Sequence, residues 1–95
     1  MAAYLIALIE VTDPEGYEEY KPIALESITQ YGGRYLARGG RRVVLEGDID
    51  AERVTVVEFE SLEALQRWYD SPEYEHGKSI RQRTSRSRLI AVEGL

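Results

Sequence analysis

The fold is decided by residues 4–14, whose sequence is YLIALIEVTDP. From Tyr4 to Val11 only Glu10 is charged, and such a short apolar run is typical of a strand that is buried on both faces. Asp13 and Pro14 follow, as a helix N-cap and as a proline at the first helical position. The segment therefore predicts a buried strand that leads directly into a helix and is covered by other structure on each face.

The predicted helix extends as far as a pair of glycines. Apolar residues recur at helical spacing from Tyr17 to Tyr31. Gly32 and Gly33 are typical of a helix end, because glycine accepts a left-handed backbone. Pro22 lies inside this helix and predicts a kink, since proline removes a backbone hydrogen bond.

Strand and turn signals alternate in the middle of the chain. They predict two antiparallel strands, of which the first is irregular. This first strand consists of residues 34–38 and 43–46, separated by Gly39 and Gly40, and a turn at Gly47 and Asp48 leads to the second strand at residues 54–59.

Two serines mark the remaining helices. Ser61 is expected to cap a second helix, and Ser71 with Pro72 is expected to start a further helical segment that Gly77 weakens. The last predicted strand covers residues 89–92.

The resulting order is strand, helix, strand, strand, helix, strand. This is the ferredoxin-like βαββαβ arrangement, an α+β fold with a four-stranded antiparallel sheet and both helices on one face. Residues 4–9 and 54–57 are apolar or near neutral at odd and even positions alike, which face opposite sides of the sheet. The sheet face without helices therefore also needs a cover. A second copy of the chain is the simplest cover, and the sequence therefore predicts a homodimer.

Composition narrows the class of protein. With 95 residues, 43% apolar residues and no cysteine, we expect one globular domain over residues 1–95 in a reducing, cytoplasmic compartment. No secretory signal or membrane span is predicted, and a net charge of −5 disfavours binding to nucleic acid or to an anionic membrane. We expect no cofactor and no metal, although the sequence does not exclude one axial histidine ligand to a haem iron.

Basic residues gather in one stretch near the C-terminus. Five of the twelve lysines and arginines lie in a stretch without acidic residues, at Lys78, Arg81, Arg83, Arg86 and Arg88. The sequence lacks the aromatic strand signature of RNA-recognition modules. We therefore expect these side chains to pair with the acidic residues of the first helix, within or between subunits.

Several short motifs occur in a characteristic order along the whole chain. They are Thr12-Asp13-Pro14, Tyr31-Gly32-Gly33-Arg34-Tyr35, Arg38-Gly39-Gly40, Leu45-Glu46-Gly47, Trp68-Tyr69-Asp70-Ser71-Pro72-Glu73-Tyr74 and Ser85-Arg86-Ser87. Taken together they resemble domain-of-unknown-function family 1330. The resemblance implies a dimeric α+β barrel, a superfamily that includes cofactor-independent monooxygenases, lactone isomerases and haem-degrading enzymes. It implies no functional residue.

His76 is the candidate catalytic residue. It is the only side chain whose ordinary pKa lies near neutrality, and it lies near a predicted break between helices, where a general base would act on a phenol or an enol. The alternative is a solvated surface histidine beside Glu75.

The candidate ligand-binding residues are three aromatic side chains and one arginine, namely Tyr17, Trp68, Tyr74 and Arg38. Aromatic rings on helices are suited to line a cleft for a flat organic molecule, and an arginine would orient an acidic oxygen. Ordinary packing of the helices on the sheet explains the same rings.

Two hypotheses of function remain. The first is a homodimer that binds a small organic molecule in a cleft between sheet and helices, with or without transforming it. The second is a non-catalytic interaction or scaffolding dimer. An unfilled cleft favours the first, and a solid interior favours the second.

Overall fold

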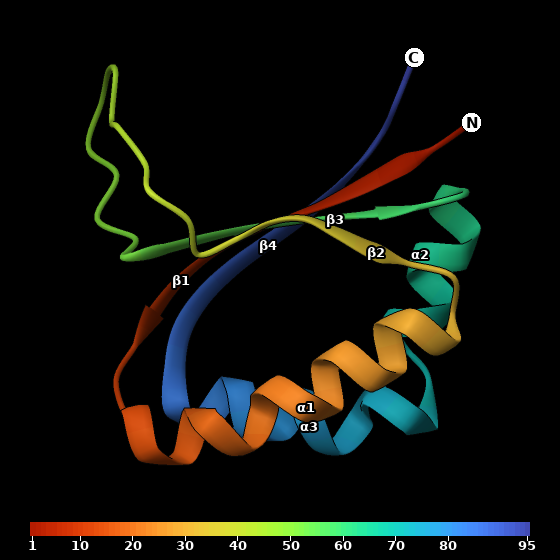
Figure 1. Cartoon of the computed structure of the whole chain (residues 1–95), viewed down its shortest axis with the longest axis horizontal. Helices are drawn as coiled ribbons and strands as arrows, with labels where there is room; N and C mark the ends of the chain where they lie inside the picture. Colours follow the sequence, from red (N-terminus) through yellow and green to blue (C-terminus); the bar gives the residue numbers. More distant parts are fainter.

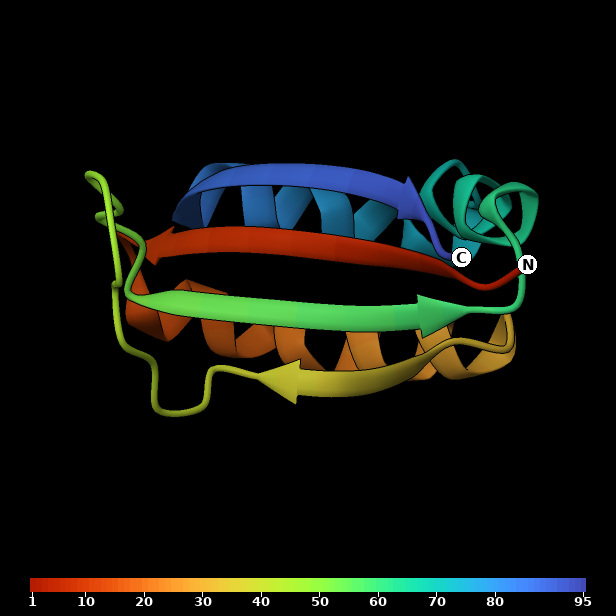
Figure 2. The same cartoon turned by 90° about the horizontal axis from the view of Figure 1, so that it is seen from above.

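The computed structural model describes residues 1–95 and contains a four-stranded sheet and three helices. In chain order the elements are β1 (Ala3–Val11), α1 (Pro14–Gln30), β2 (Arg34–Arg38), β3 (Arg53–Phe59), α2 (Leu62–Tyr69), α3 (Pro72–Thr84) and β4 (Ser85–Glu93). The strands are antiparallel and lie in the order β2-β3-β1-β4 (Figure 2). α1 and α3 lie side by side against one sheet face, and α2 stands at one end of the sheet (Figure 1). This confirms the predicted βαββαβ fold, with α2 and α3 in place of the second helix.

Each helix begins at the cap residue that the sequence predicts. The side-chain oxygens accept hydrogen bonds from backbone N–H groups three residues later: Asp13 from Gly16 at 3.2 Å, Ser61 from Ala64 at 3.0 Å and Ser71 from Tyr74 at 3.2 Å. α1 continues through Pro22, and the chain reverses at Gly32, whose φ of 81° suits only glycine without strain. None of the three helices is both long and apolar enough to cross a membrane.

The two faces of the sheet differ in burial. On β1 the odd-numbered residues from Ala3 to Ile9 face the helices and are buried, while the even-numbered residues between them face outward and are partly exposed. Val56, Ile6 and Ile90 are paired on neighbouring strands and form an apolar row across the outer face. Ile90 is 64% exposed. In the single chain, therefore, only one face of β1 has the cover that its apolar run predicts.

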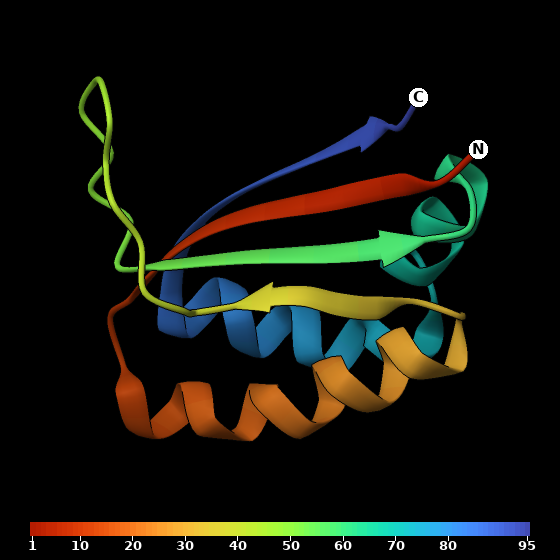
Figure 3. The ribbon, with the colours of Figure 1, turned by 45° about the horizontal axis from the view of Figure 1, so that its top comes forward.

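The predicted strand at residues 43–46 is wrong. Residues 39–52 form a loop without helix or strand, and Leu45 is 88% exposed. Gly39 N donates to Val54 O at 3.0 Å as the last bond of the β2–β3 hairpin. The φ of 64° at Gly39 then turns the chain away from the sheet, so the following residues have no strand to pair with. The loop projects on the side of the sheet without helices (Figure 1, Figure 3).

β4 is longer than the predicted strand at residues 89–92, because it begins at Ser85. Its first half is polar on both faces: Arg86 and Arg88 are exposed, while the Ser85 and Ser87 hydroxyls lie 2.6 Å apart. Pairing with β1 extends through these residues as far as Val11. A search for apolar runs misses such a polar strand end, which its partner strand holds in the sheet.

Gly77 has a different role from the one predicted. α3 is continuous over thirteen residues, and Gly77 is buried where α3 packs against α1. A Cβ atom at this position would lie 2.8 Å from Cγ2 of Ile23. The glycine thus permits the close approach of the two helices rather than marking a weak helix.

Replacing Gly77 with alanine is expected to destabilise the protein, although alanine is the better helix former. The gain in helix propensity is about 1 kcal/mol, whereas overpacking costs about 1–3 kcal/mol. We expect the free energy of unfolding, measured by urea denaturation, to fall by about 1 kcal/mol. An increase in stability would show that Ile23 moves aside freely.

Candidate functional site

An aromatic cluster closes one end of the space between α1 and the sheet. Trp68 is fully buried, and its ring centroid lies 4.1 Å from that of Tyr74 and 5.6 Å from that of Phe59. Trp68 Nε1 donates to Ser27 Oγ at 3.0 Å, which satisfies the one polar atom of the indole. The cluster forms a rigid wall.

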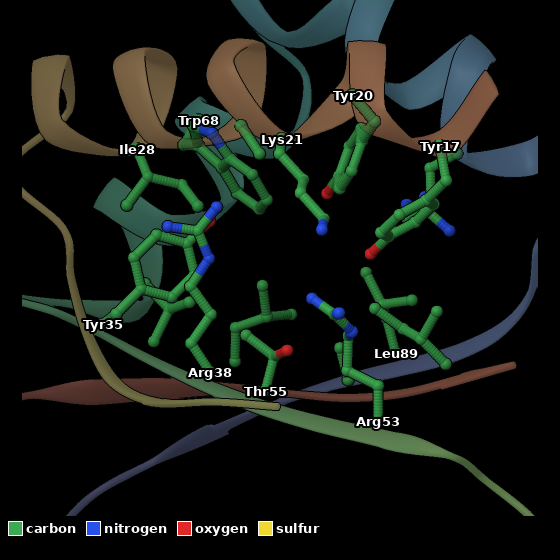
Figure 4. A pocket seen from close by; sticks show the side chains of 16 residues that line it. Tyr17, Tyr20, Lys21, Ile28, Tyr35, Arg38, Arg53, Thr55, Trp68 and Leu89 are labelled. Carbon is green, nitrogen blue, oxygen red and sulfur yellow. The ribbon is translucent and has the colours of Figure 1, made fainter. Parts of the chain in front are cut away.

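A small cavity lies beside this wall, between α1 and the inner face of the sheet. Its volume is about 30 Å³, which is room for a water molecule or two. Figure 4 shows the cationic ends of Lys21 and Arg53 and the hydroxyl groups of Tyr17 and Tyr20 converging on this space. An organic ligand would therefore have to displace side chains at the mouth of the cavity.

The charged side chains that line the cavity are all cationic, and one of them, Lys21, pairs with Glu18 outside the lining. Four cationic side chains and no carboxylate line the cavity: Lys21, Arg38, Arg53 and Arg81. The guanidinium carbons of Arg38 and Arg53 lie 4.6 Å from the Tyr35 ring centroid and 5.6 Å from the Tyr17 ring centroid, and neither arginine forms an ion pair. In a chain with a net charge of −5, this cavity is a local site of positive potential.

Arg81 is the most unusual of the four cations. It is only 4% exposed, and the single hydrogen bond that its guanidinium donates to the protein runs from Nε to the hydroxyl oxygen of Tyr74 at 3.2 Å. Burial lowers the pKa of Arg81, but the nearby Tyr74 and Tyr20 side chains raise it by more, so the guanidinium stays charged. No carboxylate lies within ion-pair distance of Arg81. A buried cation without a counter-ion is costly, and an anion beside it would offset that cost.

The tyrosines of the cavity are neutral hydrogen-bonding groups. Burial raises the pKa of Tyr17 and Tyr35, an effect that Arg53 beside Tyr17 and Arg38 beside Tyr35 offset only in part. Burial also raises the pKa of Tyr20, whose hydroxyl oxygen lies 2.8 Å from that of Tyr74. These hydroxyl groups are therefore proton donors at neutral pH and not general bases.

The structure places the predicted site residues in two separate regions. Tyr17, Arg38 and Trp68 line the cavity, and Tyr74 lies behind it, fully buried and bonded to Tyr20. His76 does not reach the cavity. It is exposed in a shallow depression on the outer side of α1 and α3, shared with Glu26 and Glu73. The functional roles of all five residues stay predictions.

Sequence reasoning missed three charged residues of the cavity, namely Lys21, Arg53 and Arg81. Arg53 had a signal, because it shares the parity of the buried residues Thr55 and Val57 on the same strand. Arg81 follows Tyr74 by seven residues, a spacing that places both on one face of α3. The basic residues around Arg81 made the whole stretch look exposed in the sequence.

The basic stretch does not pair with the acidic residues of α1 within the chain. Arg81 bonds to Tyr74, Lys78 Nζ lies 3.9 Å from the Tyr69 ring centroid, and Arg88 pairs with Asp50 at 3.3 Å. On α1 itself, Glu18 pairs with Lys21 at 2.9 Å. The predicted pairing within the chain is wrong, because Arg81 packs inward and Arg88 pairs with Asp50 instead; pairing between subunits stays a prediction. No three acidic or histidine side chains are grouped so as to hold a metal ion.

The topology and the helices on one sheet face define a ferredoxin-like α+β protein. Among proteins of this class, the chain belongs to the family described as Domain of unknown function (DUF1330), whose profile matches residues 2–95. The resemblance expected from the sequence motifs is thereby confirmed. None of the curated proteins matches the sequence.

Solved structures share the fold over nearly the whole chain. RPA0582, a protein of unknown function from Rhodopseudomonas palustris, is 21% identical with a TM-score of 0.80, over 99% of this chain and 82% of its own. A dimeric ferredoxin-like protein of unknown function from Jannaschia sp. CCS1 is 12% identical with a TM-score of 0.73, over 99% of this chain and 100% of its own. SnoaB, a cofactor-independent oxygenase from Streptomyces nogalater, is 14% identical with a TM-score of 0.71, over 99% of this chain and 93% of its own. At these identities the similarity establishes the fold alone.

Proposed function

We propose that the protein binds a small acidic organic molecule in the cavity between α1 and the sheet. The observation that carries this proposal is the lining of four cations without one carboxylate, and above all the buried Arg81 without a counter-ion. An anion would compensate the three cations without an ion-pair partner, Arg38, Arg53 and Arg81, and the apolar side chains of the lining suit a hydrocarbon body.

Entry of the ligand requires movement at the mouth of the cavity only. Arg38 is exposed and Lys21 and Arg53 are partly exposed, and all three have long, flexible stems. Trp68 and the strands beneath are held by packing and hydrogen bonds. We therefore propose that the cations swing outward and close over the bound anion.

The fold is consistent with a binding or catalytic role of this kind. The similarity to SnoaB, which is a cofactor-independent oxygenase, is compatible with small-molecule binding in a protein of this shape. Cations around an acidic ligand favour its ionised form, which for a phenol or an enol is the more reactive form.

Two ligands of nearly the same size and shape, one anionic and one neutral, test the proposal. Benzoate is expected to raise the melting temperature. At a concentration a hundredfold above Kd, it should raise the free energy of unfolding by about 2.7 kcal/mol, while benzamide is expected to have little effect. Arg53→Met should weaken benzoate binding about tenfold, as expected for a charge-assisted contact. Arg83→Met, at an exposed position on α3, is the matched control and should bind normally.

His76→Gln belongs in the same experiment. Because His76 lies outside the cavity, the variant should bind benzoate as the wild type does. Loss of turnover with intact binding, once a substrate is known, would assign the predicted base role to His76. Equal effects of benzoate and benzamide on the wild type would instead contradict an anion site.

We further propose that the protein is a homodimer in which the bare sheet face is covered by a second copy. The apolar row of Val56, Ile6 and Ile90 supports this proposal, as does the dimeric state of the ferredoxin-like protein from Jannaschia. A non-catalytic dimer is the second candidate function, and the small volume of the cavity favours it. Failure of every acidic ligand to bind would support that alternative.

A further inference from the structure

We propose that Arg81, Tyr74 and Tyr20 form a directed chain of hydrogen bonds that presents one polarised proton to the cavity, where it holds the oxyanion of a phenol or an enol. This inference rests on the proposed function, since it names the ligand class of the same cavity. It begins from two buried contacts: Arg81 Nε to the Tyr74 hydroxyl at 3.2 Å, and the Tyr74 hydroxyl to the Tyr20 hydroxyl at 2.8 Å.

The chemistry of the groups sets the direction of the chain. A guanidinium only donates, so the Tyr74 oxygen must accept from Arg81. Tyr74 is fully buried and its hydroxyl has no other side-chain partner than Arg81 and Tyr20. If Tyr20 donated to Tyr74, the Tyr74 proton would be buried without an acceptor, which is costly. Tyr74 therefore donates to Tyr20, and the Tyr20 proton is free for another acceptor.

That free proton faces the cavity. Tyr20 lines the cavity, and Figure 4 shows its hydroxyl group pointing into it, on the same side as the ammonium of Lys21. Hydrogen bonds in series polarise one another, and this series starts at a buried positive charge. The Tyr20 hydroxyl is thus a stronger donor than an isolated tyrosine, and an anionic oxygen is the acceptor that gains most from it.

The apolar lining favours tighter binding of a phenol or an enol than of a carboxylate such as benzoate, although the cations hold both. A carboxylate must lose its hydration before it enters, whereas a phenol or an enol can enter neutral and ionise once it has reached Tyr20 and the cations. The proton released passes to water at the cavity mouth, so no other reactant is required. Such a site lowers the pKa of the bound ligand.

4-Nitrophenol is a direct probe, because its phenolate absorbs visible light and its ionisation is followed by absorbance as pH is varied. In the wild type, the bound probe is expected to ionise at a lower pH than the free probe. Tyr20→Phe should raise the pKa of the bound probe by about one to two units, the value of a hydrogen bond to a charged group. Tyr74→Phe should raise it by a smaller amount, since it removes only the polarisation.

Tyr31→Phe is the matched control. It removes a hydroxyl that donates to Glu73 at 2.7 Å on the protein surface, away from the cavity, and should leave the pKa of the bound probe unchanged. The pKa of the probe reports on the oxyanion contact and not on folding. The melting temperature of each variant, measured separately, shows whether it is folded.

The outcomes distinguish this inference from the proposed function. If benzoate and 4-nitrophenolate both fail to bind the wild type, the proposed function falls and this inference with it. If benzoate binds and the phenolate does not, or if Tyr20→Phe leaves the pKa of the bound probe unchanged, only the hydrogen-bond chain is overturned. A large change in the pKa of the bound probe in Tyr17→Phe, with none in Tyr20→Phe, would likewise overturn the inference. The donor to the oxyanion would then be Tyr17, which is not part of the hydrogen-bond chain.

Discussion

Replacing Trp68 with alanine is expected to lower the free energy of unfolding by about 3–5 kcal/mol. The side chain is fully buried, its ring lies against Tyr74 and Phe59, and its Nε1 donates to Ser27. Removing it leaves a cavity that two rigid rings cannot close by relaxing. A domain of this size has a total stability of about 5–15 kcal/mol, so the variant would be close to unfolding at room temperature.

Urea denaturation followed by circular dichroism measures this loss. Fluorescence is unsuitable for the comparison, because Trp68 is the only tryptophan and the variant has none. Trp68→Phe keeps most of the ring packing but loses the bond to Ser27, and it should cost clearly less than alanine. A loss below about 1 kcal/mol in Trp68→Ala would mean that the wall beside the cavity is not rigid.

Replacing Ile6 with lysine is expected to abolish the dimer. Ile6 lies between Val56 and Ile90 in the centre of the outer sheet face. In a two-fold symmetric dimer the substitution introduces two lysines into one interface, and each would be buried without a partner. Light scattering after gel filtration should give about twice the chain mass of 10.9 kDa for the wild type and a single chain mass, or unfolded protein, for the variant.

Leu25→Lys is the control for this experiment. Leu25 is a large apolar residue that is 45% exposed on α1, away from the outer sheet face. The same lysine there should leave the dimer intact and change stability little. A wild type that is monomeric at micromolar concentration, or a dimeric Ile6→Lys variant, would refute the proposed interface.

Local signals in the sequence were enough to predict most of the fold. The caps at Asp13, Ser61 and Ser71 act within three residues, so their prediction needs no knowledge of tertiary contacts. The errors at residues 43–46 and at Ser85 have the opposite cause. A strand exists only where a neighbour pairs with it: the apolar segment has none, whereas the polar start of β4 has β1.

The candidate site was predictable only in part for a related reason. Tyr17 and Trp68 could be placed towards the interior because aromatic residues at helical spacing face a core. The direction of a charged side chain does not follow from spacing alone. Arg81 is buried whereas the nearby Arg83 is exposed, and His76, on the same helix, faces solvent. Only the packing of α3 against α1 separates the two.

The strand order β2-β3-β1-β4 has a consequence for how the chain folds. If the chain is divided within the loop of residues 39–52, β1 and β2 belong to the first half and β3 and β4 to the second. Every neighbouring pair in the sheet then joins one strand of each half. Neither half can close a single strand pair alone, so during synthesis no part of the sheet can form until β3 has left the ribosome. The β2–β3 pair closes across the loop, but both pairs made by β1 join residues far apart in sequence, which is the condition for slow folding.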